Sequence, residues 1–338
     1  AAYSIIHDDI CDYQMNGAHE FWAEGESRGM SLGWGIIVSR AFRTDPLFPG
    51  GGDCWGFLTQ LQERGQQIVN HTWDHPVLVP ISEGAQAGDQ GDIDDLHEEL
   101  IESGEMTESS IGVRMGFFVY PEDVANEHIF GILKDAGYIG SRGGDQNVST
   151  LNSWDVDTSD PYYDFRIYYD PYCEQPGFSN HGQGAEALLN YLNAAVEQGK
   201  WALRELHSIR ATAGEQGHGW CPVTLDIYQA HLDDLVGRIG SRQLWMDNAE
   251  ELVKYRRVRE HCGTPELAGD QLTFSASSDA MCQAYARPVT VAIQAWEGVS
   301  TSDGEELPGD RLPRKTPATG CQPPPSKQPR TPKAPWPA

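Results

Sequence analysis

The chain is predicted to have an α/β fold, with a parallel sheet covered by helices and a small β appendage after it. Three observations lead to this prediction. Short apolar runs typical of buried strands alternate with helix-like stretches up to about residue 260. Four of these runs end in polar residues, which is where a parallel barrel carries its reactive groups. The alternation stops near Cys262.

The expected strands are short and apolar, and the expected helices carry apolar residues at helical spacing. The strands are 3–6, 32–38, 67–69, 116–120 and 201–206. The helices are 54–64, 93–102, 126–136, 184–198, 225–237 and 248–259. Because strand and helix follow each other in turn, the strands are expected to be parallel.

The C-terminal part of the chain has a different pattern. Segments 271–275 and 288–295 are expected to be two strands of the appendage. Beyond Ser302 the chain is rich in proline and has no acidic residue after Asp310, so we expect poor order there. The predicted regions are therefore an α/β domain over 1–262, a β appendage over 263–301 and a tail over 302–338.

The composition excludes several classes of function. Fifty acidic residues against 24 basic ones give a formal charge of −26, which repels nucleic acid phosphates and anionic lipid. No apolar run approaches the roughly 20 residues that a membrane span needs. We therefore expect no nucleic acid partner and no membrane contact. The excess acid is interpreted as a solvated surface rather than a patch that steers a substrate.

The seven cysteines contain no CxxC pair, so the sequence predicts neither a zinc ribbon nor a thioredoxin motif. Disulfide bonds in an oxidising compartment fit these cysteines better. The chain opens with Ala1 and Ala2 directly before a strand, as a secreted or periplasmic protein does once its signal peptide is removed. The odd count leaves at least one thiol over, and the pairing is not predicted.

Two histidines, His71 and His75, lie four residues apart, so one helical turn would place both imidazoles on one face at metal-binding distance. Alone, this spacing more often has no function. Asp8 and Asp9 at the end of the first strand add support, because a hydrolytic zinc site needs a third ligand and a nearby base. The alternative for the Asp pair is a turn or a helix cap.

The order of these motifs resembles the polysaccharide deacetylases, also called the NodB homology family or carbohydrate esterase family 4. Segment 4–9 is similar to their first motif, TFDDG, and 70–75 to their second, H(S/T)xxH. Segment 118–121 is similar to the third motif and 205–208 to the fifth. The resemblance covers residues 3–260, and several features in the right order are far more specific than one alone.

The resemblance implies a distorted (β/α) barrel of the NodB type and a metal-dependent hydrolase that removes acetyl groups from a glycan. It makes Asp9, His71 and His75 the ligands of zinc, with cobalt or nickel as substitutes. It makes Asp8 the general base and His207 the general acid. A backbone N–H within 120–122 would help the metal to stabilise the oxyanion.

The resemblance also suggests residues that contact the substrate. Tyr120 and Pro121 belong to the third motif, and Trp154 lies in a segment with the composition of the fourth motif but not its spacing. Trp220 is expected either to stack on a sugar ring or to belong to the core. Arg142 could orient the base in place of the arginine that usually opens the third motif, or it could form a surface or structural ion pair.

The chain departs from the family pattern at several positions. Val119 stands where the third motif has arginine, Ile10 where the first has glycine, and His7 where the first has an aromatic residue. Val119 and the irregular fourth motif leave open a catalytically impaired carbohydrate-binding relative. A metal-dependent hydrolase of a non-sugar amide also stays open, because fold and metal do not determine the substrate. The expected partner is an acetylated glycan, with chitin, peptidoglycan and xylan all open, and we expect a monomer.

Overall fold

The computed structural model describes residues 1–12, 21–43, 53–144, 150–173, 184–211, 220–262, 266–268, 271–273 and 282. The chain divides into two compact units, Ala1–His261 and Cys262–Ala338. In the second unit, β11 (Glu266–Ala268) pairs with β12 (Gln271–Thr273) in an antiparallel hairpin. The strand expected at 271–275 is thus present as β12, whereas 288–295 lies outside the described residues.

The first unit alternates strands and helices. Its strands are β1 (Ala2–Ile10), β2 (Gly33–Ile36), β3 (Gln67–Asn70), β4 (Phe117–Val124), β5 (Gly140–Gly144), β6 (Asp170–Pro171), β7 (Trp201–Leu206), β8 (Ile209–Arg210), β9 (Val223–Thr224) and β10 (Trp245–Met246). Its helices are α1 (Ala23–Glu26), α2 (Val38–Ala41), α3 (Cys54–Glu63), α4 (Leu78–Gln86), α5 (Gln90–His97), α6 (Ser103–Ile111), α7 (Glu127–Ala136), α8 (Gly184–Gln198), α9 (Leu225–Gly240) and α10 (Ala249–His261). A π-helical segment (Glu98–Glu102) joins α5 to α6, and a 3₁₀ turn covers Tyr163–Phe165.

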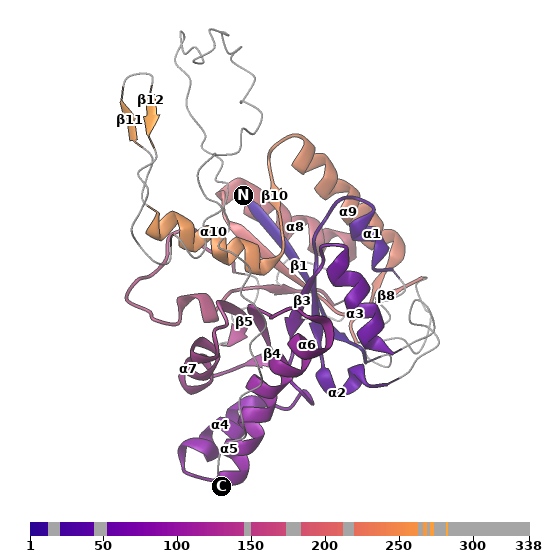
Figure 1. Ribbon diagram of the computed structural model, residues 1–338. Coiled ribbons are helices and arrows are strands. Elements are labelled where there is room, and N and C mark those ends of the chain that lie inside the picture. The colour runs from indigo at the N-terminus through magenta and orange to yellow at the C-terminus, as the bar shows by residue number, and fades with distance from the viewer. Residues whose placement is uncertain are drawn as a thin grey trace. The chain divides into compact units, whose positions relative to one another are not determined.

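The main sheet has the strand order β5-β4-β3-β2-β1-β7-β6, with β10 paired to β1. Its strand pairs are parallel, as predicted. Figure 1 shows β1 inside the first unit with helices such as α3, α8, α9 and α10 around it. All nine residues of β1 are buried, because both faces of this strand are covered.

The sheet curls until its two ends meet at an irregular seam. Ile167 forms a parallel bridge with Arg142 of β5, and three residues later β6 pairs with β7. One short segment therefore links the first and the last strand of the order. This is a distorted (β/α) barrel, the fold class expected from the sequence.

Most helix positions agree with the sequence, since their termini carry ordinary caps. Asp53 and Asn126 accept hydrogen bonds from the first turns of α3 and α7, and Gly137 ends α7 at φ 91°. The helix expected at 93–102 differs, because α5 changes to π-helical geometry from Glu98 onward.

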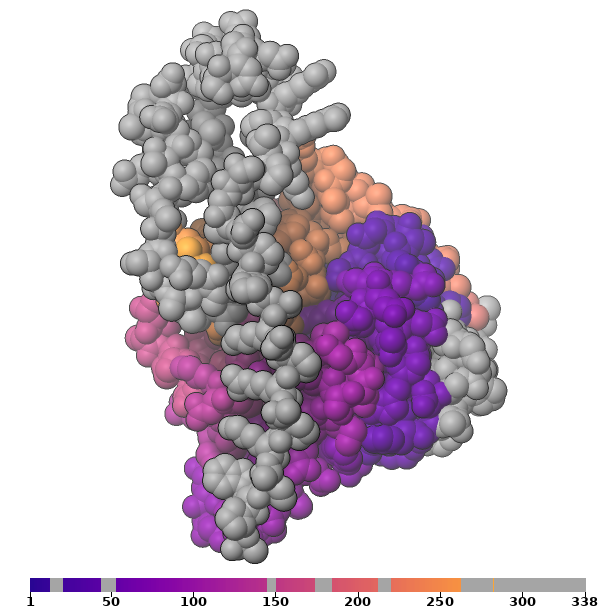
Figure 2. All heavy atoms as spheres, in the orientation of Figure 1, coloured from indigo at the N-terminus to yellow at the C-terminus, as the bar shows by residue number. Residues whose placement is uncertain are grey.

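The longest helical insertion lies between β3 and β4 and contains α4, α5, the π segment and α6. Figure 1 shows α4 and α5 side by side, projecting from the rest of the first unit, and Figure 2 shows the same violet projection at one end. No helix in the described ranges combines the length and the apolar content that a membrane span needs.

Candidate metal and acid–base site

Side chains from the carboxyl ends of several strands gather at one edge of the barrel. β1 supplies Asp8 and Asp9, and the segment after β3 supplies His71 and His75. His207 follows the last residue of β7. The sequence separates these residues by up to about 200 positions, but parallel strands bring their carboxyl ends to the same edge.

Asp9, His71 and His75 have the geometry of a metal-ligand set. The Oδ1 atom of Asp9 lies 3.4 Å from Nε2 of His71 and 3.6 Å from Nε2 of His75. Zinc ligands at about 2.0 to 2.1 Å in tetrahedral geometry are separated by about 3.3 to 3.4 Å. The donor atoms of the three residues all lie within 4.8 Å of one another. This donor set therefore fits a zinc ion.

The orientation of the His71 ring supports the same conclusion. Its Nδ1 lies 2.9 Å from the carbonyl oxygen of Val119, which can only accept, so Nδ1 carries a proton. In neutral imidazole the other nitrogen, Nε2, then points a lone pair at the carboxylate of Asp9. Two acceptors facing each other need a cation or a proton between them. A carbonyl partner on Nδ1 is also the usual arrangement of a metal-binding histidine.

The two histidines are not brought together by a helical turn, so that expectation is wrong. Residues 71–76 form an irregular segment after β3, and Thr72 and His75 have φ values of 70° and 66°. These left-handed conformations interrupt a helix. The Thr72 Oγ1 accepts a hydrogen bond of 2.9 Å from the His75 N–H, and the imidazole centroids come within 4.6 Å.

The electrostatics of the three residues favour a positive charge among them. Burial acts to raise the pKa of Asp9, but the hydrogen bond and charge of His71 outweigh it and lower that pKa. Burial acts to lower the pKa of His71, yet its contacts with Asp9 and the charge of Asp8 raise it. Burial, then the nearby His71, lowers the pKa of His75 to about 4. His75 is therefore neutral at pH 7, as a metal ligand must be.

Asp8 has a different partner from Asp9. Arg142 on β5 places Nη2 at 2.7 Å from the Asp8 Oδ2 and at 2.8 Å from the Asp123 Oδ1. The Arg142 side chain is only 1% exposed, so a surface ion pair is wrong for this residue. Neighbours on a regular strand point to opposite faces, and Asp9 at φ 61° breaks this alternation, so both aspartates reach the site while they contact different partners.

Glu205 and Asp123 belong to the site although the sequence analysis assigned neither of them a role. Oε1 of Glu205 lies 3.4 Å from Nδ1 of His207, and Oε2 lies 3.4 Å from Nη1 of Arg142. Glu205 and His207 are two residues apart at the end of β7, and this spacing could have revealed that they share a face. Asp123 follows the third motif, and sequence periodicity carries no signal for it because Glu122 and Asp123 are both left-handed.

A second group with metal-ligand geometry contains Asp8, Glu205 and His207. The guanidinium of Arg142 contacts both carboxylates of this group. It already supplies the positive charge that they need, so this group fits an ion-pair network better than a second metal.

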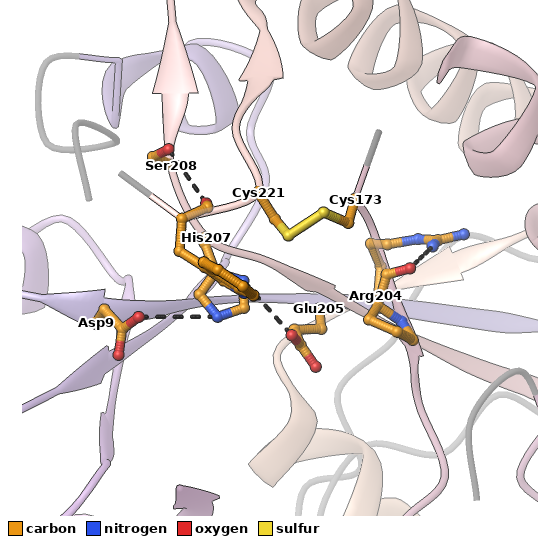
Figure 3. Close-up of a disulfide and its surroundings, with 9 residues drawn as sticks. Asp9, Cys173, Arg204, Glu205, His207, Ser208 and Cys221 are labelled. Carbon is orange, nitrogen blue, oxygen red and sulfur yellow. Dashed lines mark hydrogen bonds and ion pairs between the residues drawn. A yellow bond between two sulfur atoms is a disulfide. The ribbon is translucent and has the colours of Figure 1, made fainter. Parts of the chain in front are cut away.

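His207 lies between the two acidic groups. Its Nε2 is 3.8 Å from the Asp9 Oδ2, and Figure 3 shows the ring between Asp9 and Glu205. The His207 carbonyl oxygen accepts from Nδ1 of His7, 3.1 Å away, and His7 stacks on Trp34 with ring centroids 4.8 Å apart. His7 therefore packs as an aromatic ring and donates a hydrogen bond to the backbone of His207.

The remaining expected substrate contacts lie differently. Tyr120 is buried, and its hydroxyl bonds Ser141 Oγ at 2.5 Å, so its side chain belongs to the core; Pro121 is buried in β4 beside it. Trp154 packs on Trp201, the first residue of β7. That is the amino end of the strand, opposite the histidines, so the structure does not bring Trp154 to the site.

Trp220 is 42% exposed and precedes Cys221, whose disulfide to Cys173 lies beside His207 in Figure 3. The Ser208 hydroxyl donates to the Trp220 carbonyl at 3.4 Å, which joins this segment to the residue after His207. A core role for Trp220 is therefore wrong. Two further disulfides join Cys11 to Cys54 and Cys262 to Cys282.

Comparison with known proteins supports the fold. No protein-family model and no curated sequence matches the chain. A solved structure from Mycobacterium smegmatis, described as a candidate polysaccharide deacetylase, is 14% identical with a TM-score of 0.52; the match covers 79% of this chain and 94% of that one. A family 4 acetyl xylan esterase from Clostridium thermocellum, solved with a cobalt ion, is 12% identical with a TM-score of 0.44 over 75% and 91% of the two chains. The chain therefore has the polysaccharide deacetylase fold.

Proposed function

We propose that this protein is a metal-dependent hydrolase that removes acetyl groups from a carbohydrate and releases acetate. The observation that carries the proposal is that Asp9, His71 and His75 lie together. Beside them are the carboxylate of Asp8, which is paired with Arg142, and the imidazole of His207. A hydrolytic zinc site needs these parts: three protein ligands, a base and an acid. The fold and the ordered motifs support the same activity.

Asp9, His71 and His75 would hold the metal, and imidazole with carboxylate is a donor set that suits zinc, cobalt or nickel better than calcium or magnesium. When bound, the metal would polarise the acetyl carbonyl and lower the pKa of a bound water toward about 7.

Asp8 is proposed as the general base that takes the proton of the attacking water. Its Oδ2 is held by the Arg142 guanidinium at 2.7 Å. A charged hydrogen-bond donor fixes the direction of a carboxylate, and general bases act only when they are in hydrogen-bond reach of the proton. Arg142 therefore serves the role of the arginine that Val119 replaces in the third motif.

His207 is proposed as the general acid that protonates the departing amine or hydroxyl. Its Nε2 faces Asp9, while Glu205 lies at Nδ1 on the other side of the ring. A carboxylate at Nδ1 orients an imidazole and stabilises its protonated form. Glu205 is thus proposed as the partner of His207 that the irregular fourth motif leaves open.

The proposed substrate is an acetylated glycan. The exposed Trp220 beside the His207 segment offers an aromatic face of the kind that stacks on sugar rings. Three disulfides suit an oxidising compartment, so we propose a secreted or periplasmic protein. Because one chain supplies every proposed group, we also propose that the monomer is active, which light scattering of the active protein tests.

Three variants test the division of labour, with zinc content and acetate release measured for each. Asp8→Asn should retain zinc and lose about 10² to 10⁴-fold in rate. Asp9→Asn should bind zinc more weakly, because an amide is a poorer ligand than a carboxylate. His207→Ala should retain zinc and lose more activity on N-acetyl than on O-acetyl substrates, since an amine departs poorly without a proton.

The substrates are chitooligosaccharide, acetylated xylan, peptidoglycan fragments and simple amides. Turnover of simple amides alone would favour the non-sugar alternative. If Asp8→Asn loses zinc while Asp9→Asn keeps zinc and activity, the roles of the two aspartates are reversed. If all three variants remain active, the proposed mechanism is wrong.

A further inference from the structure

Glu99 is a buried carboxylate in the helical insertion between β3 and β4. It is 5% exposed and lies next to Leu96, Leu100 and Ser103, which are also buried. A buried carboxylate is costly unless several donors surround it. The proposed mechanism does not use Glu99, so its partners indicate why it is placed there.

The partners of Glu99 lie in the segment between two proposed metal ligands. Its Oε2 accepts hydrogen bonds from the backbone N–H groups of Trp73 at 2.8 Å and Asp74 at 3.0 Å. The hydroxyl of Thr72 also lies close enough to this carboxylate to counteract the rise in its pKa that burial causes. One carboxylate therefore contacts all three residues between His71 and His75.

This segment needs an external restraint. Thr72 and His75 are held in left-handed conformations at φ 70° and 66°. Such conformations cost free energy in residues other than glycine and persist only where the surroundings enforce them. Thr72 Oγ1 accepts from the His75 N–H at 2.9 Å, so the contact with Glu99 reaches the second histidine through Thr72.

The other side of Glu99 is tied back to β3. Glu99 lies in the π-helical segment, and its carbonyl oxygen accepts from Ser103 Oγ at 2.7 Å. The side-chain amide N–H of Asn70 donates to Ser103 Oγ at 2.8 Å. The Oδ1 atom of Asn70 accepts from the Thr72 N–H at 2.9 Å. The hydrogen bonds thus form a closed circuit from β3 through the π segment to the histidine segment.

We infer that Glu99 is a positioning residue for the metal site, which holds the 72–75 backbone so that His71 and His75 face Asp9 together. This inference rests on the proposed function. Residues that orient metal ligands typically contribute about 10- to 100-fold in metal affinity. The insertion between β3 and β4 therefore supports the metal site through its π segment.

The test is the affinity of the full chain for Zn²⁺, measured by competition with a chromophoric chelator, and the visible spectrum of bound Co²⁺. Glu99→Ala should weaken Zn²⁺ binding about 10- to 100-fold and change the Co²⁺ spectrum, while the near-UV circular dichroism stays native. Glu99→Gln should keep most of the affinity, because its amide oxygen can accept the same two backbone N–H groups. Asp95→Asn, which removes an exposed charge from α5, is the matched control and should bind like wild type.

A loss of less than about threefold for Glu99→Ala, with an unchanged Co²⁺ spectrum, overturns the inference. If Glu99→Ala does not fold, Glu99→Asp is judged by the same limit, since its shorter carboxylate keeps the charge but loses the reach. A wild-type protein that binds neither ion overturns the proposed function, and this inference with it. Wild-type binding with no effect of Glu99 overturns the inference alone.

Discussion

Replacing Arg142 by methionine removes one buried positive charge from a network of three carboxylates. The guanidinium lies 2.7 Å from Asp8, 2.8 Å from Asp123 and 3.4 Å from Glu205. Methionine fills much of the same volume, so the change removes the charge with little loss of packing. Asp8 and Glu205 are buried and would lose their shared counter-charge.

The expected loss of stability follows from this burial. Removing one partner of a buried ion pair costs about 3 to 5 kcal/mol, because the other charge stays uncompensated. Domains are stable by about 5 to 15 kcal/mol, so Arg142→Met should fold but unfold at clearly lower denaturant concentration. It should also lose activity, since Asp8 loses its orientation, while Asp9, His71 and His75 keep their zinc.

The assay is equilibrium unfolding in urea together with zinc content. Arg64→Met is the control, because Arg64 is 49% exposed where it pairs with Glu26, and such pairs contribute about 0 to 1 kcal/mol. Adding Glu205→Gln to Arg142→Met should recover part of the loss, since it removes one uncompensated charge. An Arg142→Met protein within about 1 kcal/mol of wild type refutes the reasoning about the buried network.

Three further predictions concern the rim of the site, the core and the second unit. Trp220→Ala should raise KM for a glycan with little change in kcat, and an unchanged KM argues against stacking on sugar. Burial lowers the pKa of His231 to about 3. Between about pH 6.5 and 3, the unfolded chain therefore binds a proton at this residue that the folded chain does not bind. As a result, about 2.5 kcal/mol of folding stability should be lost from pH 7 to pH 4.5. His231→Gln, which can still bond the Tyr3 hydroxyl, should show a flatter pH dependence in unfolding, and an equally steep one contradicts this assignment. A chain ending at residue 262, with Cys262→Ser, should stay folded, zinc-bound and active because every proposed metal ligand and acid–base group precedes Arg210; a folded, zinc-bound but inactive product overturns the domain assignment.

Sequence patterns predicted the parallel α/β sheet, and the resemblance to the polysaccharide deacetylases implied the barrel and most of the residues that the structure brings together at its edge. Apolar runs that end in Asp8, Asn70 and His207 indicate strands with polar carboxyl ends, and this signal is local. Strand–helix alternation then implies parallel strands, so the ends must share one edge. Periodicity also located β12, because a short strand has the same local signature wherever it lies.

Tertiary structure alone decided how the side chains of the site are held. Arg142 meets Asp8 across 134 positions, and Glu99 meets Trp73 across 26, so no local pattern reports either contact. The helical turn expected for His71 and His75 failed for the same reason: left-handed conformations at Thr72 and His75 depend on hydrogen bonds from outside the segment. Trp154 matched the composition of a site motif yet lies at the amino end of β7, because composition does not determine which end of a strand a loop reaches. Local propensity determines which elements form, whereas the partners of buried charges are determined only when distant strands pack together.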